Sequence, residues 1–241
     1  MPLHLVILNS IFLVSFIALL IRTIYFKQAS TKNSVIGKLI VYFFITNTFL
    51  ITNLINQTLW LYSYGLILLI GVFEIIKMNR SIKYGFYIKS FFVVLIVGHF
   101  LLLYRYLLLG YSGLYIASVY FIVVCTDGFN QLSGVFFGKT HFLKKLSPGK
   151  TIEGYVGGFV LTFTFSTLFL KSFFIGLPYS ISILIVLLVI LTSNIGDLIF
   201  SGLKRHYKIK DFSKIIPYHG GILDRFDSFI FASFCLYLIT H

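Results

Sequence analysis

Apolar residues run through most of this chain in long stretches, and the polar residues gather in the shorter segments between them. A stretch of about 20 apolar residues is long enough for a helix to cross the hydrocarbon core of a bilayer. The pattern therefore predicts an all-α, polytopic integral membrane protein with about eight transmembrane helices, forming one membrane domain over residues 1–241. The predicted helices are 4–22, 38–56, 58–76, 86–104, 106–126, 154–175, 179–200 and 223–240.

The composition supports this interpretation. Hydrophobic residues make up 58% of the chain and charged residues only 11%, with a mean hydropathy of +0.95. Soluble domains are about one quarter charged, so this chain could not cover a water-facing surface. Cys125 and Cys235 both lie in apolar runs, which predicts small buried side chains and no disulfide framework. The run at 4–22 has no basic segment before it and no small-residue cleavage site, so we expect a retained helix.

The basic residues sort cleanly to one side of this predicted topology. If both termini are outside, 18 of the 20 Lys and Arg residues lie on the inner side, and only Arg105 and Lys171 lie on the outer side. Cytoplasmic loops carry such an excess of basic residues. The net charge of +13 is thus explained by topology and by contact with anionic lipid headgroups, and nucleic acid is not a predicted partner.

The acidic residues are few, and five of the seven are aspartates between positions 127 and 227. Asp127 and Asp197 are predicted to end two helices, whereas Asp224 and Asp227 begin the last one and, three residues apart, share a face of it. All four are expected at the cytoplasmic face of the membrane. Carboxylates that converge from separate helices suit a hard cation such as Mg²⁺, which prefers oxygen ligands and bridges to substrate phosphates.

Basic and glycine-rich segments surround these carboxylates. The stretch 196–208 places Asp197, Ser201, Lys204 and Lys208 on one helical stripe, and the glycines of "YHGGILDRFD" (218–227) expose backbone N–H groups that suit phosphate. Two simpler interpretations stay open: the basic run could contact lipid only, and Asp224 with Arg225 could be a charge pair at a helix end. "SPGKT" (147–151) is no Walker A loop, and the GxxxG at 154–158 is typical of helix packing.

Taken together, these motifs resemble those of the phosphatidate cytidylyltransferase (CDP-diacylglycerol synthase) family. The family's C-terminal pattern is kept, with every spacing, over 27 positions, 201–227. It is matched here by Ser201, Lys204, Arg205, Lys210, Asp211, Ser213, Pro217, His219, Gly220, Gly221, Asp224, Arg225 and Asp227. The upstream block agrees at Asp127, Gly134, Phe137, Gly138, Lys139, Ser147, Pro148, Lys150, Thr151, Glu153 and Gly154. The resemblance covers the half at 127–241, whereas helices within 1–126 match only in being hydrophobic.

The resemblance implies a nucleotidyltransferase of phospholipid biosynthesis in the bacterial inner membrane, with its active site facing the cytoplasm. A phosphatidate oxygen would attack the α-phosphorus of CTP and give CDP-diacylglycerol and pyrophosphate, with Mg²⁺ as cofactor and a second cation left open. The resemblance implies metal ligands at Asp224, Asp227, Asp197 and Asp127. It implies that the catalytic residues are Asp224, Asp227, Asp197, Lys204 and Arg205. Substrate-binding groups would be Ser201, Lys210, His219, Gly220, Gly221, Arg225, Lys139, Lys150 and Thr151.

One departure from the family pattern concerns the lipid acceptor. Bacterial members commonly follow the first aspartate with a Thr-Gly-Ala-Tyr type run, whereas this chain has Gly-Phe-Asn-Gln at 128–131. This departure leaves the lipid acceptor open. The alternative functions are a CTP-dependent polyprenol or phytol kinase, a cytidylyltransferase for another lipid phosphate and, from a different class, a transporter. A transporter would line a path through the membrane midplane with polar groups, whereas these gather at one face. The expected partners are CTP, the lipid phosphate and membrane lipids, and a homodimer is left open.

Overall fold

The structure of the protein is a computed structural model. It describes residues 57–81, 85–109, 113–142, 149–170, 176–216 and 220–240, together with 37, 40–41, 43–49, 51–52, 146–147 and 174. The helices are α3 (Gln57–Ser81), α4 (Phe86–Leu109), α5 (Gly113–Phe137), α6 (Ile152–Leu168), α8 (Tyr179–His206) and α9 (Leu223–Thr240). Residues 43–49 are also helical, and within the described ranges the only β-type pairing is an isolated bridge between Ile216 and Gly220. The all-α prediction is confirmed for this part of the chain.

Helix positions agree with the sequence prediction, but several ends do not. The last helix was predicted at 223–240 and has those bounds. The predicted ends at 126 and 200 are wrong, because α5 continues to Phe137 and α8 continues to His206. The break predicted around position 105 is also misplaced, since α4 runs on to Leu109 and α5 begins at Gly113. The predicted helix 4–22 lies outside the described residues, whereas residues 40–41, 43–49 and 51–52 of the predicted helix 38–56 are described and helical.

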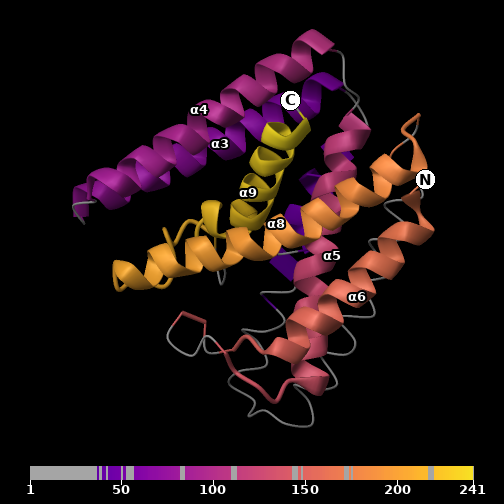
Figure 1. Ribbon diagram of the computed structural model, residues 1–241. Coiled ribbons are helices and arrows are strands. Elements are labelled where there is room, and N and C mark those ends of the chain that lie inside the picture. Colours follow the sequence, from indigo (N-terminus) through magenta and orange to yellow (C-terminus); the bar gives the residue numbers. More distant parts are fainter. Residues whose placement is uncertain are drawn as a thin grey trace.

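Helix α9 lies at the centre of the arrangement. Figure 1 shows α3 and α4 side by side, α5 beside α6, and α9 between the α3–α4 pair and α8. Helix α9 contacts α3, α4, α5 and α8, with the most extensive contact to α8. The residues at its beginning are thus surrounded by elements from both halves of the chain.

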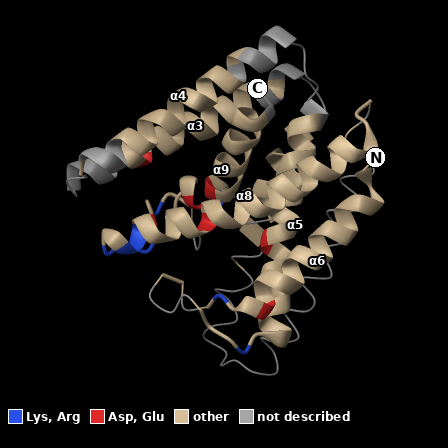
Figure 2. Cartoon of the chain, viewed as in Figure 1, with Lys and Arg blue, Asp and Glu red and all other residues tan. Residues whose placement is uncertain are grey.

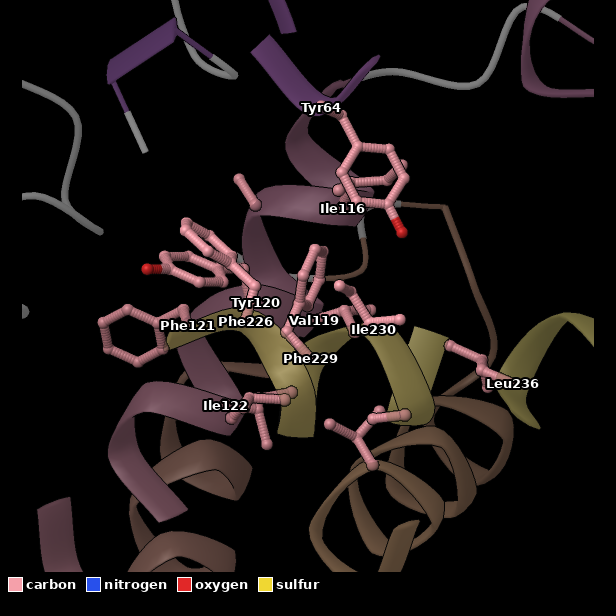
Figure 3. Packing of buried hydrophobic residues seen from close by; sticks show 14 of the residues in the cluster. Tyr64, Ile116, Val119, Tyr120, Phe121, Ile122, Phe226, Phe229, Ile230 and Leu236 are labelled. Carbon is pink, nitrogen blue, oxygen red and sulfur yellow. The ribbon is translucent and has the colours of Figure 1, made fainter. Parts of the chain in front are cut away.

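Aromatic side chains pack the inner face of α9 against α5 (Figure 3). Phe226 stacks on Tyr120 with ring centroids 5.6 Å apart, and Phe229 meets the same tyrosine edge-on at 5.2 Å. Such pairs contribute about 0.5–1.5 kcal/mol each beyond the area they bury. Because Phe226 and Phe229 lie between and beyond Asp224 and Asp227 in sequence, this packing fixes the rotation of α9 and the direction of both carboxylates.

Glycines allow α5 and α6 to cross closely. A Cβ added at Gly154 would lie 3.1 Å from the Cα of Gly134, and one added at Gly158 would overlap the side chain of Asn130. Close backbone approach through small residues is how helices pack in membranes, where lipid removes the hydrophobic drive for association. The helix-packing interpretation of the GxxxG at 154–158 is therefore confirmed.

Two of the described helices are long and apolar enough to cross a membrane, Tyr115–Phe137 and Tyr179–His206. Large apolar side chains also project from other helices, with Phe73 and Val94 each 58% exposed. A water-facing surface would not carry so many, whereas lipid solvates them without cost. The helices, the exposed side chains and the composition together indicate a membrane protein.

Candidate active site

The described acidic and basic residues gather in the lower and left parts of the view in Figure 2, around the end of α8, the start of α9 and the start of α6. Asp127 and Asp197 do not end their helices as predicted, because each lies inside a helix that continues. The helices continue because the polar residues beyond the aspartates contact neighbouring helices: Asn130, one turn after Asp127, donates to Asn194 at 2.7 Å. A polar run therefore does not mark a helix end here.

Lys204 joins the two aspartates of α9. Its Nζ lies 2.9 Å from Oδ1 of Asp224 and 3.4 Å from Oδ2 of Asp227, and its side chain is only 13% exposed. The carboxylates share one face of α9 as the three-residue spacing predicts, and Lys204 approaches them from the last turns of α8. A buried carboxylate needs such a partner, since an unpaired buried charge is strongly destabilising.

Both carboxylate oxygens of Asp224 have partners within the protein. Besides Lys204 on Oδ1, Oδ2 accepts the backbone N–H groups of Phe212 at 2.7 Å and Gly221 at 3.0 Å, and the side chain has no exposed surface. Asp224 thereby holds the segment before α9 in place. Gly220 takes a φ of +95°, which favours glycine. His219, predicted beside these glycines, lies outside the described residues.

A second charged cluster joins α8 to the loop before α6. Lys150 forms an ion pair with Oδ2 of Asp197, and Ser201 donates to Oδ1 of the same carboxylate at 3.4 Å. Burial lowers the pKa of Lys150, but the charges and hydrogen bonds of Asp197 and Tyr155 together outweigh burial, so the pKa of Lys150 is raised and the side chain stays charged. The ammonium also lies 5.7 Å from the ring centroid of Tyr155. The lysine of "SPGKT" is therefore brought to the aspartates.

Asp127 and Arg225 complete the constellation. The Asp127 carboxylate interacts electrostatically with Asp197, Asp227, Lys150 and Arg225. Of the four aspartates, it alone has no hydrogen-bond or ion-pair partner among the residues that the structure describes. The buried Nε of Arg225 likewise lacks a hydrogen-bond acceptor within that part of the chain. One carboxylate and one guanidinium near each other thus keep bonding capacity for a ligand.

The remaining predicted residues hold the surrounding segments together. Arg205 donates through Nε to the carbonyl of Leu146 and through Nη1 to that of Ile209, both at 3.1 Å, which ties the loop before α6 to the end of α8. Thr151 is the N-cap of α6, where its Oγ1 accepts the N–H of Gly154 at 3.1 Å. Lys210 is exposed on the segment that follows α8.

Lys139 lies on the loop after α5, whose backbone is held by the start of α6. Glu153 accepts the N–H of Lys139 at 3.0 Å and that of Thr140 at 3.0 and 3.2 Å. Those backbone donors lower the pKa of Glu153 to about 2. This exposed carboxylate therefore stays charged and anchors the loop that carries Lys139.

The aspartate carboxylates offer part of what a divalent cation requires. In the described ranges, no group of three or more His, Cys, Asp or Glu side chains is arranged to hold a metal. Mg²⁺, however, is usually held by one or two carboxylates together with waters and substrate phosphates. Asp127, which has no hydrogen-bond or ion-pair partner among the described residues, and Asp227, whose Lys204 contact is long at 3.4 Å, provide that smaller donor set. The donors fit Mg²⁺ better than they fit a cation held by protein ligands alone.

The sequence left one contact of the site open and did not indicate another. From the sequence, Glu74 of α3 could either touch the site or pair with Lys77 three residues later; in the structure it contacts the start of α9. The signal was present, since an ionisable residue inside an apolar helix needs a specific partner. The Asn130–Asn194 hydrogen bond had no such signal. It shows that part of the atypical 128–131 run serves contacts between helices.

Comparison with known proteins identifies the family of this chain. A sequence model described as the cytidylyltransferase family matches residues 2–241. A protein of Bacillus subtilis (strain 168) named phosphatidate cytidylyltransferase is 40% identical over 129 residues, 54% of this chain and 48% of that protein. Proteins of the same name from Staphylococcus haemolyticus (strain JCSC1435) and Staphylococcus aureus (strain COL) are 40% and 41% identical over 120 residues, 49% of this chain and 45% of theirs. The chain thus spans about half the length of the curated relatives it matches. Because the family match extends over almost every residue, the chain belongs to the cytidylyltransferase family.

Proposed function

We propose that this protein transfers a cytidylyl group from CTP to phosphatidate. A phosphate oxygen of the lipid forms a bond to the α-phosphorus of CTP, the bond from that phosphorus to the bridging oxygen breaks, and CDP-diacylglycerol and pyrophosphate result. One observation carries the proposal: aspartates of three helices meet Lys150, Lys204 and Arg225 in one cluster, in a chain similar to proteins named phosphatidate cytidylyltransferase. Such a cluster is suited to two polyanionic substrates, because its basic side chains can bind the phosphates of both.

The reaction needs little proton transfer from the protein. A phosphate monoester has a second pKa of about 6, so the lipid phosphate is largely a dianion near neutral pH and is already a nucleophile. Catalysis then consists of aligning the two substrates and compensating their charge. We assign phosphate binding to Arg225, whose Nε has no acceptor in the described structure, and to Lys150 and Lys204. Both lysines contact carboxylates now and could turn to phosphate oxygens when substrate is present.

The proposed cofactor is Mg²⁺, held by Asp127 and Asp227 with Asp197 beside them. A bound Mg²⁺ supplies charge compensation at the phosphates of the nucleotide. We propose that Asp224 supports the site through backbone contacts instead, since both of its oxygens are already engaged. This distinguishes two aspartates that the sequence pattern treats alike.

The proposed location is the bacterial inner membrane, with eight helices and the site open to the cytoplasm, where CTP is. The distribution of charge supports this orientation, because the basic residues fall almost wholly on the side that carries the aspartates. The described charged residues are also concentrated in one part of the structure (Figure 2).

The test is product analysis with purified protein in detergent, given CTP, Mg²⁺ and phosphatidic acid. We expect release of pyrophosphate that requires both lipid and metal and that Asp227→Asn abolishes. Release of CDP instead would identify a CTP-dependent lipid kinase. Turnover only with another lipid phosphate would assign a different acceptor. A lack of product with every lipid phosphate tested would refute the proposal.

A further inference from the structure

Glu74, in the interior of α3, is a fully buried carboxylate that accepts three hydrogen bonds. Its Oε1 accepts from Ser213 Oγ at 2.6 Å and from the N–H of Ile222 at 2.9 Å. Its Oε2 accepts from the N–H of Leu223 at 2.9 Å. None of these partners is close in sequence, so they depend on the tertiary structure.

These contacts place Glu74 at the N-terminus of α9. The first N–H groups of a helix have no partner within the helix and are usually capped by a side chain of the preceding residues. Here a residue of another helix, 148 positions before Ile222, takes that role. A negative charge at this end of a helix also interacts favourably with the helix dipole.

The capped residues lie next to the proposed site. Leu223 immediately precedes Asp224, and the N–H of Gly221 is held by Asp224 itself. A Cβ at Gly221 would lie only 2.8 Å from each carboxylate oxygen of Glu74. Glu74 and Asp224 thus both hold the short segment 221–223, and Lys204 links Asp224 to Asp227.

We propose that Glu74 is a positioning residue: it anchors the start of α9 and thereby sets where Asp227 and Arg225 stand relative to α5 and α8. Nothing in the cytidylyltransferase motifs includes this residue. Its catalytic consequence rests on the proposed function, whereas the anchoring itself does not. It gives the first half of the chain a defined role in the site.

Hydrogen–deuterium exchange of the full-length protein tests the anchoring. Glu74→Ala should speed exchange of the Ile222 and Leu223 amides by about tenfold, because they lose their acceptors. Exchange around 139–154 should not change. The matched control is Glu153→Gln, which alters another carboxylate that holds backbone N–H groups at a helix start. It should raise exchange at Lys139 and Thr140 and leave Ile222 and Leu223 unchanged.

Pyrophosphate release, measured at a temperature where all variants are folded, tests the positioning. Glu74→Ala should lower kcat by about 10²-fold, as expected for a displacement near 1 Å, with a smaller change in KM for CTP. Glu74→Gln keeps the length and one acceptor oxygen, so its kcat should be intermediate. Gly221→Ala, which displaces Glu74 without removing it, should resemble Glu74→Ala both in amide exchange and in pyrophosphate release.

The outcomes separate the two claims. Unchanged exchange at Ile222 and Leu223 in Glu74→Ala would overturn the anchoring. Faster exchange with wild-type kcat would overturn the positioning role and leave Glu74 as a contributor to stability only. If the wild-type protein released no pyrophosphate while the exchange results held, the proposed function would be wrong and the anchoring would stand.

Discussion

Asp224 and Asp227 both belong to the aspartate motif of the sequence, but the structure gives them different hydrogen-bond partners. We propose different roles for them on this basis, and Asp224→Asn tests the difference. The Asp224 carboxylate accepts from Lys204 at 2.9 Å and from the backbone N–H groups of Phe212 and Gly221 at 2.7 and 3.0 Å. An asparagine of the same shape has one acceptor oxygen. If that oxygen keeps the two backbone donors, its NH₂ group faces the ammonium of Lys204.

The magnitude follows from the lost contacts. A hydrogen bond to a charged group contributes about 1.5–3 kcal/mol, and the substitution removes one and weakens two, so we expect Asp224→Asn to cost about 2–3 kcal/mol. Asp227 is held by the neighbouring N–H of Ser228 at 2.8 Å and by the longer Lys204 contact at 3.4 Å. Asp227→Asn should therefore cost only about 1 kcal/mol, while it abolishes pyrophosphate release.

Thermal unfolding in detergent measures both variants side by side. About 1 kcal/mol shifts the Tm of a chain of this size by about 2–4 °C, so Asp224→Asn should unfold about 4–12 °C below the wild-type protein. Asp227→Asn should unfold within about 4 °C of it. The assignment of roles would be refuted if Asp224→Asn were as stable as wild type, or if Asp227→Asn were the less stable of the two.

Three further predictions concern the helix contacts, the loop after α5 and the metal. A double-mutant cycle of Asn130→Ala and Asn194→Ala should give a coupling of about 1 kcal/mol in thermal stability, and additive effects would contradict the hydrogen bond between them. The pKa of Glu153 is lowered to about 2, so its contribution to stability should be full above about pH 4.3, its unfolded value, and vanish as pH falls through about 2. Melting curves of wild type and Glu153→Gln should therefore converge at the acid end of this range, and a constant difference would argue against the anchor. Chelation of divalent cations should stop pyrophosphate release and added Mg²⁺ should restore it, whereas activity in excess chelator would exclude the proposed cofactor.

The sequence was sufficient where local patterns dominate. Apolar stretches long enough to cross the hydrocarbon core of a bilayer predicted the helices. The bounds of 223–240 were predicted correctly because a polar, glycine-containing turn leads into a mainly apolar run. The three-residue spacing likewise predicted that Asp224 and Asp227 share a face. The helical spacing of Asp197, Ser201 and Lys204 was predicted too, because helical periodicity is a local property. Lys208, predicted on the same stripe, instead lies beyond the end of α8 at His206 and has a φ of 57°.

The tertiary structure decided what depends on neighbours distant in sequence. The ends of α5 and α8 were predicted too early because the polar residues beyond Asp127 and Asp197 face other helices, which hydropathy cannot distinguish from polar residues that face water. Asp224 and Asp227 differ only in which donors surround them. The partners of Glu74, which are Ser213, Ile222 and Leu223, lie 139, 148 and 149 positions away in the sequence. A charged residue in an apolar helix predicts a partner, because burying an unpaired charge costs too much free energy. Only the packing of the helices determines which residue that partner is.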